Sequence, residues 1–278
     1  MNKKFYYYKI FNLDIKSQTP IKALDEVKQP SSMPDILITI GKTPNTLLKP
    51  LRNKNLYYQM AENEFLFFNE SLGLKFYAKN GTEIIIDKDC MGDTDNVSLF
   101  LLGSVMGATL YMRNYLPLHA STILSSRGAV MFTGISGVGK STIAYALYKR
   151  GYKVISDDIA PLKLENNKLF LYSSYPKMKL WENALDLNKV SGNFPQIKVS
   201  FNKYYVSYDP LDQNQALPIY KIYNLEIHND HAVSTLDKTI EKDRFKIIYA
   251  NSYRNNYING LNKQSTFFEI ATKLARYP

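Results

Sequence analysis

The chain has 278 residues, of which 45% are hydrophobic and 22% are charged, so it can bury the core of one large domain or of two ordinary ones. Its formal net charge of +10 favours an anionic partner, but the Lys and Arg residues are spread along the chain and do not predict nucleic-acid binding. A single cysteine excludes an internal disulfide and a cysteine-based zinc site. These features fit a cytoplasmic protein.

Two segments bear on the membrane question. Residues 1–10 are basic and aromatic, without the apolar stretch and cleavage site of a secretory signal. Residues 99–112 form the most apolar segment, which contains Gly103 and Gly107. At about fourteen residues this segment is shorter than a membrane span, and it predicts a buried helix. We therefore expect no membrane partner.

The first part of the chain has the composition of β-strands. The expected strands are residues 6–11, 36–40, 56–58, 64–68, 74–78 and 82–86. Asn80-Gly81 predicts a hairpin, because both residues tolerate positive φ. The acidic segment 87–95 is typical of a linker. We therefore predict a small β-rich domain of residues 1–95, followed by a second domain of residues 96–278.

A glycine-rich loop follows the short apolar strand expected at residues 129–133. Its pattern is G-x-x-x-x-G-K-[ST], and residues 141–149 after it have the spacing of a helix that ends at Arg150-Gly151. Strand, loop and helix in this order predict a P-loop, in which backbone amides and a helix N-terminus face phosphate groups. A chance match in a core helix is the alternative. The residues expected to hold a nucleoside triphosphate are Gly134, Ser136, Gly137, Val138, Gly139, Lys140, Ser141 and Thr142.

The next apolar strand, residues 152–156, ends in Asp157-Asp158. A carboxylate at the end of a neighbouring strand completes the Mg²⁺ site in P-loop proteins. Adjacent strand residues point to opposite sides, so one acid can face the metal while the other approaches the group that is phosphorylated. An exposed turn is the alternative interpretation. His119, considered alone, is more typical of a structural histidine.

The spacing of these residues resembles the HPr kinase/phosphorylase superfamily. His119 stands fifteen positions before Gly134, Lys140 stands twenty-one after His119, and Asp158 stands eighteen after Lys140. An Arg-Gly pair, a strand and two acids follow the loop helix in both. The resemblance implies an α/β kinase domain of HPr kinase type with a mixed sheet.

The resemblance also implies roles for the site residues and a need for ATP and Mg²⁺. Lys140 would hold the phosphates, and Ser141 and Asp157 would bind Mg²⁺. Asp158 would take the proton from the acceptor hydroxyl, with His119 beside it to tune its basicity.

Other segments differ from the regulatory enzymes of this superfamily. Thr142 stands where those enzymes carry Glu, and residues 165–278 lack their glycine-rich signature. The segment Tyr175–Trp181 instead resembles the Y-P-x-x-K/R-L-W motif of HPr-kinase-like tailoring enzymes, which phosphorylate a serine near the C-terminus of lasso peptide precursors. The opening of the N-terminal domain resembles theirs as well. Lys177, Lys179 and Arg254 are minor candidates for holding phosphate or a peptide carboxylate, and we expect Trp181 to be a partly buried core aromatic.

The sequence therefore predicts an ATP-dependent serine kinase that acts on a precursor peptide or a small protein. The first alternative is a regulatory HPr(Ser) kinase/phosphorylase, and the second is a non-catalytic, nucleotide-gated peptide-binding module. Residues 1–95 are expected to help bind the peptide, because strand edges can accept an extended chain. A homo-oligomer is compatible with the sequence.

Overall fold

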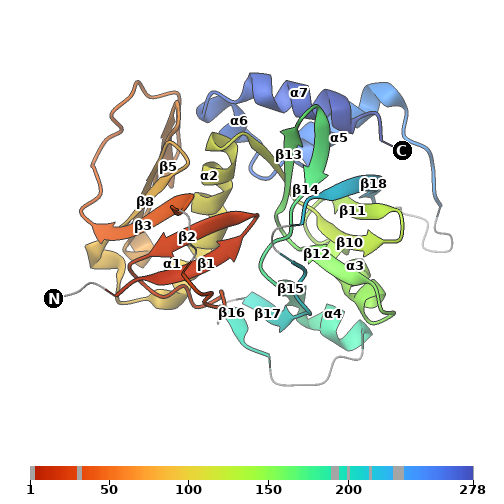
Figure 1. Cartoon of the computed structure of the whole chain (residues 1–278), viewed down its shortest axis with the longest axis horizontal. Coiled ribbons are helices and arrows are strands. Elements are labelled where there is room, and N and C mark those ends of the chain that lie inside the picture. The colour runs from red at the N-terminus through yellow and green to blue at the C-terminus, as the bar shows by residue number, and fades with distance from the viewer. Residues whose placement is uncertain are drawn as a thin grey trace. The chain divides into compact units, whose positions relative to one another are not determined.

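The computed structural model describes most of the chain, and its elements are drawn in Figure 1. The described residues are 4–29, 33–188, 194–198, 201–212, 215–227 and 235–277. The chain divides into two compact units, each built from two stretches of sequence. The first unit contains Met1–Tyr115 and Asn256–Phe267, and the second contains Leu116–Asn255 and Phe268–Pro278.

The first unit is built on an eight-stranded sheet. In spatial order its strands are β1 (Tyr6–Ile10), β2 (Leu13–Ser17), β3 (Ile36–Gly41), β8 (Glu83–Asp87), β7 (Leu74–Lys79), β6 (Glu64–Asn69), β5 (Tyr58–Ala61) and β4 (Asn53–Lys54). β3 runs parallel to both β2 and β8, and the other pairs are antiparallel. The first unit is therefore β-rich, with a mixed sheet.

Two turns of this sheet contain consecutive residues with positive φ. Asn80 and Gly81 have φ of 54° and 69° and join β7 to β8 in the predicted hairpin. Phe11 and Asn12 have φ of 57° and 58° and join β1 to β2. β2 was not among the expected strands, although its residues alternate between buried and half-buried positions.

The apolar segment predicted as a buried helix forms three continuous helical pieces. They are α1 (Thr94–Phe100), the π-helical η3 (Leu101–Val105) and α2 (Met106–Met112). Every residue from Leu101 to Met112 is buried, and η3 and α2 contact strand β7. The division between the units therefore falls after Tyr115 rather than near residue 95, because this helix belongs to the core of the first sheet. The short 3₁₀ turns η1 (Glu70–Leu72) and η2 (Lys88–Cys90) complete this part of the chain.

A late segment of the chain completes the core of the first unit. In α6 (Asn256–Gly260), Tyr257 is fully buried, and its ring lies 5.5 Å from that of Tyr58 and 5.0 Å from that of Phe65. Lys263 donates a hydrogen bond from Nζ to the carbonyl oxygen of Met112. Residues from both ends of the sequence therefore share one core.

The second unit contains a seven-stranded sheet. In spatial order its strands are β12 (Lys153–Ser156), β10 (Ser121–Ser125), β11 (Gly128–Gly134), β18 (Leu217–Leu225), β14 (Lys168–Leu171), β13 (Ala160–Glu165) and β9 (Tyr115–Leu118). β11 and β18 are parallel, whereas β10 is antiparallel to both β11 and β12. The sheet is therefore mixed, as the sequence predicts for this part of the chain. Two helices, α5 (Glu241–Ala250) and α7 (Gln264–Leu274), follow β18 along the chain.

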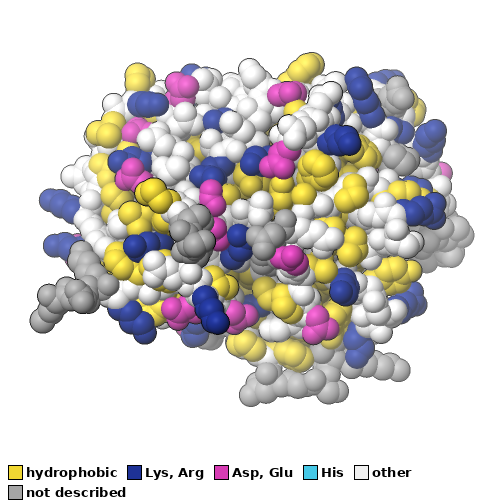
Figure 2. Space-filling model, viewed as in Figure 1, with side chains coloured by type: hydrophobic (Ala, Val, Ile, Leu, Met, Phe, Trp, Pro, Cys, Tyr) yellow, Lys and Arg dark blue, Asp and Glu magenta, His cyan; other side chains and the backbone are white. Residues whose placement is uncertain are grey.

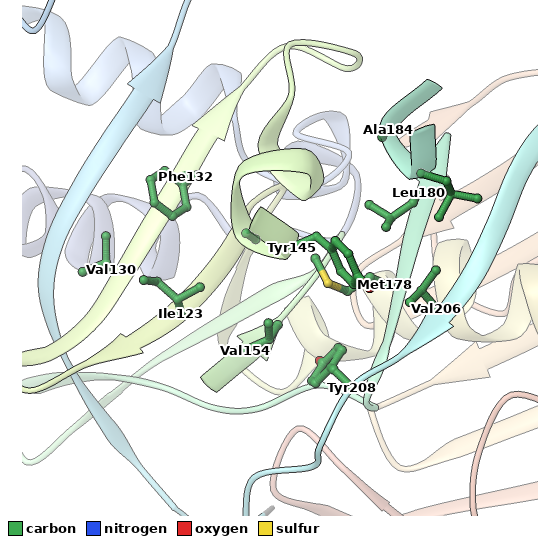
Figure 3. Close-up of a cluster of buried hydrophobic side chains, with 12 residues drawn as sticks. Ile123, Val130, Phe132, Tyr145, Val154, Met178, Leu180, Ala184, Val206 and Tyr208 are labelled. Atoms are coloured by element: carbon green, nitrogen blue, oxygen red, sulfur yellow. The ribbon is translucent and has the colours of Figure 1, made fainter. Parts of the chain in front are cut away.

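A three-stranded sheet in the second unit packs against the helix that follows the glycine loop. Its order is β15 (Lys177–Trp181), β17 (Phe201–Ser207) and β16 (Gln196–Lys198), and α4 (Glu182–Leu187) continues from β15. Met178 and Leu180 of β15 join Tyr145 of α3 (Lys140–Tyr148) in one apolar cluster, which Figure 3 shows. This cluster fixes β15 beside α3.

The described part of the chain has no helix that is both long and apolar enough to cross a bilayer. On the face drawn in Figure 2, Lys and Arg side chains are interspersed with acidic and apolar ones and do not gather into one basic patch.

Met178 offers a test of the cluster that holds β15 beside α3. Its side chain is fully buried, so Met178→Ala leaves a cavity and is expected to lower the free energy of unfolding by about 2–5 kcal/mol. Ile227→Ala is the matched control, because Ile227 is 70% exposed and should change stability by less than about 0.5 kcal/mol. Denaturant unfolding followed by circular dichroism measures both. Equal midpoints for the two variants would contradict this packing.

Candidate active site

The glycine loop connects β11 to α3. β11 ends at Gly134 and α3 begins at Lys140, so a strand enters the loop and a helix leaves it. Gly134 has φ of 134°, and a Cβ there would lie 2.5 Å from the carbonyl oxygen of Leu225, so only glycine fits. Gly139, which precedes the first turn of α3, has φ of 104°.

Asn251 anchors the start of this loop. Its Oδ1 accepts a hydrogen bond from the backbone N–H of Gly134 at 2.7 Å, and its backbone carbonyl accepts one from the N–H of His119 at 2.8 Å. Its Nδ2 donates to Oδ1 of Asn224 and to the carbonyl of Ile247. The sequence analysis missed Asn251, because it lies 117 positions after Gly134 and matches no motif.

Lys140 is buried within the loop. Its Nζ donates to the carbonyl oxygens of Gly134 at 2.8 Å and Ile135 at 2.9 Å. Burial lowers the pKa of Lys140, and the charges of Asp157 and Asp158 act in the opposite direction. The ammonium group is therefore held at the mouth of the loop by backbone dipoles.

Asp157 is held by three donors. Its Oδ1 accepts hydrogen bonds from Ser121 Oγ at 2.6 Å and from Ser141 Oγ at 2.8 Å, and its Oδ2 accepts one from the backbone N–H of Lys179 at 2.9 Å. Asp157 is only 3% exposed, so these three hydrogen bonds set the position of its carboxylate. The sequence analysis did not identify Ser121 as a site residue. It lies beside Asp157 because β10, the strand that contains Ser121, is paired with β12.

Ser141 and Asp157 fit a Mg²⁺ ion better than an ion whose ligands must all come from the protein. They offer one hydroxyl and one carboxylate at hydrogen-bond distance, and both are hard oxygen donors. The described residues contain no cluster of three or more His, Cys, Asp or Glu that could hold a metal. Mg²⁺ commonly takes one or two protein oxygens and completes its shell with phosphate oxygens and water.

Asp158 lies between a lysine and a histidine. Lys179 Nζ is 2.6 Å from its Oδ2, and His119 Nε2 is 3.7 Å from its Oδ1. Its φ of 71° lies in the left-handed region, which is uncommon for a residue with a side chain. Burial acts to raise the pKa of Asp158, but the positive charge of Lys179 and the proximity of His119 outweigh burial and lower it to about 2.

His119 lies beside Asp158 and contacts one aromatic ring. Burial lowers its pKa, and this effect exceeds the opposing influence of the Asp158 carboxylate. The ring of Tyr253 lies edge-on to the imidazole at 6.2 Å.

One cavity of about 810 Å³ joins most of the candidate residues. Those in its lining are His119, Ser136, Gly137, Val138, Gly139, Lys140, Ser141, Thr142, Asp157, Asp158 and Lys179. Neither Lys177 nor Arg254 contributes to this lining. The side chain of Lys177 is half-buried on β15, and the Arg254 guanidinium lies 5.7 Å from the ring of Tyr253.

Trp181 corrects an expectation from the sequence. It was predicted to be a partly buried core aromatic, but it is 42% exposed and lines the cavity. In β15, Met178 and Leu180 take the buried positions, so strand alternation places Trp181 on the other face.

Comparisons with known proteins find similarity over part of the chain. No protein-family model matches it. An HPr kinase/phosphorylase from Listeria monocytogenes serotype 4a (strain HCC23) is 34% identical over 74 residues, which cover 24% of this chain and 24% of that protein. Proteins of the same name from Listeria innocua serovar 6a and Listeria welshimeri serovar 6b match to the same extent.

The chain therefore spans about a quarter of the length of these curated relatives, because the matched segment covers 24% of each relative. The solved structure of the HPr(Ser) kinase/phosphatase from Coxiella burnetii is 36% identical over 20% of this chain and 37% of that chain, with a TM-score of 0.19. In sequence, one part of the chain is thus similar to the HPr kinase/phosphorylase superfamily.

Proposed function

We propose that the protein is a Mg²⁺-dependent kinase that transfers the γ-phosphoryl group of ATP to a serine hydroxyl. The observation that carries this proposal is a single cavity that brings together the glycine loop, Lys140, the Ser141–Asp157 pair and Asp158. These are the parts that phosphoryl transfer needs, because its catalysis depends on positioning and charge neutralisation. The partial similarity to HPr kinase/phosphorylases supports the same class of reaction.

The glycine loop and Lys140 would hold the phosphates. Backbone amides and the N-terminus of α3, a helix of nine residues, attract an anion at this point. Lys140 donates to two loop carbonyls, and phosphate oxygens are stronger acceptors than these neutral groups. Triphosphate binding would therefore exchange neutral partners of Lys140 for charged ones.

Ser141 and Asp157 would hold Mg²⁺ next to the phosphates. Bound there, the ion supplies neutralisation of negative charge on the β- and γ-phosphate oxygens. The three donors to Asp157 keep its carboxylate in place, so little rearrangement is needed.

Asp158 would receive the acceptor hydroxyl. In the reaction the bond between the γ-phosphorus and the ADP oxygen breaks, a bond from the phosphorus to the serine Oγ forms, and the serine proton passes to Asp158. A carboxylate with a pKa near 2 is a weak base, which suits a loose transition state in which the proton leaves late. His119 would lie beside Asp158 and tune its basicity.

The acceptor would be a peptide, in particular the C-terminal serine of a ribosomally made precursor such as that of a lasso peptide. The motif-like segment Tyr175–Trp181 supports this substrate, because three of its residues line the cavity and Lys179 pairs with Asp158. The net charge of +10 favours encounter with a carboxylate-bearing chain. Residues 1–95 would contribute a docking edge for the peptide.

The competing candidate is a regulatory kinase/phosphorylase that acts on HPr, and the similarity to proteins of that name favours it. The two candidates share the loop and the acids and differ in the acceptor.

The phosphate and acceptor roles can be separated by two substitutions. Lys140→Ala should lower the rate of phosphopeptide formation by about 10³-fold or more, because it removes the cation from the phosphates. Asp158→Asn should abolish transfer while keeping the affinity for Mg²⁺–ATP within about threefold, because its role concerns the acceptor proton. Calorimetric titration and radiolabel transfer provide the two measurements. Lys149→Ala, at the exposed position that directly follows α3, is the control.

Near-normal turnover by Lys140→Ala would contradict the assignment of the phosphate site. Loss of nucleotide binding in Asp158→Asn would make Asp158 a metal ligand. Nucleotide binding without any phosphopeptide in the unaltered protein would favour the nucleotide-gated binding module.

The pH dependence tests the pairing of Asp158 with Lys179. The pKa of Asp158 is lowered to about 2, so its carboxylate stays ionised as the pH falls from 8 to 4.5, and kcat/KM should show no loss from its protonation. Lys179→Met removes the largest lowering influence, so the pKa of Asp158 rises and kcat/KM should fall on the acid side at least one pH unit earlier. Lys179→Arg, which keeps the cation, should preserve the original profile. If kcat/KM fell at the same acidic pH in Lys179→Met and Lys179→Arg, the pairing of Asp158 with Lys179 would be refuted.

The acceptor is tested by offering HPr and, separately, short peptides that end in serine. Phosphorylation of the peptides, detected by mass spectrometry, and none of HPr is the expected result. Leu56→Asp, on an 84% exposed position beside the edge strand β4, should raise the KM for the peptide severalfold and leave the affinity for ATP unchanged. Efficient phosphorylation of HPr alone would establish the regulatory candidate.

A further inference from the structure

Trp181 and Lys203 form a paired surface on the wall of the cavity that the glycine loop also lines. They stand opposite each other in the antiparallel pair of β15 and β17. Lys203 Nζ lies 4.8 Å from the centroid of the Trp181 ring, and both residues line the cavity. We call this pair the Trp181–Lys203 shelf.

The cation of this shelf has no acidic partner in the described part of the chain. The nearby acid of the cavity wall, Glu182, accepts a hydrogen bond from Asn202 Nδ2. Lys140 and Lys179, the other two lysines of the cavity, are held by loop carbonyls and by Asp158. Among these three lysines, Lys203 can therefore bind an incoming anion without first breaking a hydrogen bond to a loop carbonyl or an ion pair with a carboxylate.

Lys203 also lies near enough to act on the two catalytic groups. The pKa of Asp158 is controlled mainly by burial, Lys179 and His119, and Lys203 contributes a further lowering. Lys203 also adds to the lowering of the pKa of Lys140, which is due chiefly to burial. An anion on Lys203 would thus lie within electrostatic range of the acceptor carboxylate.

Strand alternation places Trp181 on the same face of β15 as Lys179, the lysine that pairs with Asp158. Met178 and Leu180 point from one face of β15 into the cluster with α3, the helix that follows the glycine loop (Figure 3). Lys179 and Trp181 belong to the opposite face, and Lys179 reaches Asp158 from there. A ligand group on Trp181 would therefore lie on the face of β15 from which Lys179 reaches Asp158.

We propose that the Trp181–Lys203 shelf is the acceptor subsite and recognises a carboxylate next to the acceptor serine, with Lys203 pairing with the carboxylate and Trp181 packing against the neighbouring side chain. This inference rests on the proposed kinase function and specifies its substrate. Exposed Leu187 of α4, also in the lining, extends the apolar part of the subsite. The carboxylate can come from the C-terminus of the peptide or from an acidic side chain.

Trp181 is the single tryptophan of the chain, so its fluorescence reports on the subsite directly. The full-length protein is titrated with three probes: acetyl-Ala-Leu-Ser with a free carboxylate, the same peptide as an amide, and acetyl-Asp-Leu-Ser-amide. A fourth titration uses Mg²⁺ with the β,γ-imido analogue of ATP. We expect a saturable change in emission with the free-acid peptide at concentrations where its amide has no effect. The nucleotide alone should leave the emission unchanged.

The third probe distinguishes the two sources of the carboxylate, because a response to it and to the free acid alike would show that an acidic side chain suffices. A change in emission with the nucleotide and none with any peptide would make the shelf a platform for the base and overturn the proposal. An unchanged Trp181 emission with all four probes would overturn the proposal as well.

Substitution of Lys203 gives an independent measurement. Lys203→Met should raise the dissociation constant and the KM of the free-acid peptide about tenfold or more, as expected for loss of a charge-assisted contact, while Lys203→Arg retains most of the affinity. Lys221→Met is the matched control, because Lys221 lies over the ring of Tyr223 at 5.3 Å but outside this cavity. Its peptide affinity should equal that of the unaltered protein.

The two proposals fail in different ways. Phosphopeptide formation with an unchanged KM in Lys203→Met would refute the subsite and leave the kinase function intact. Peptide binding at Trp181 without any phosphopeptide would support the subsite and refute the kinase function.

Discussion

One residue of an edge strand joins the two acids on which the site depends. The backbone N–H of Lys179 donates to Asp157, and its ammonium group pairs with Asp158 at 2.6 Å. Asp157 and Asp158 follow β12 of the seven-stranded sheet, whereas Lys179 belongs to β15 of the three-stranded sheet. Both carboxylates therefore have their positions only when the small sheet is docked beside α3. The apolar cluster around Met178 supplies that docking, so burial of apolar surface determines the geometry of charged groups.

The loop depends on a second long-range contact. Asn251 binds the N–H of Gly134 through its side chain and the N–H of His119 through its carbonyl, so it positions the start of the glycine loop and the histidine together. An amide side chain suits this place because it supplies an acceptor to Gly134 and a donor to Asn224 and Ile247 at the same time. The loop is thus positioned by a residue from beyond α5.

The charges of the cavity are nearly all matched within the protein. Lys140 is held by carbonyl dipoles and Lys179 by Asp158, while Asp157 accepts from two hydroxyls and an amide. A triphosphate entering this cavity would compete with those internal partners, whereas Lys203 is the described cation of the cavity that an acceptor could bind without such competition. The lowered pKa of Asp158 follows from the same balance, because Lys179 and His119 together outweigh its burial.

The sequence alone determined the local elements of the site, because these depend on neighbours in the chain. The glycine pattern predicted a strand before Gly134 and a helix from Lys140, and Asn80-Gly81 predicted a hairpin through its backbone preferences. Spacing brought His119, Lys140 and the two acids into one hypothesis.

Only the tertiary structure decided that Lys179 pairs with Asp158, that Ser121 and Asn251 hold the site together, and that Trp181 is exposed. It also placed α1, η3, α2 and α6 in the first unit, although two of these segments are separated by more than a hundred residues of the chain. The reason is physical: backbone preferences act over a few residues, whereas the partner of a buried charge or an apolar face is chosen by the packing of the whole domain.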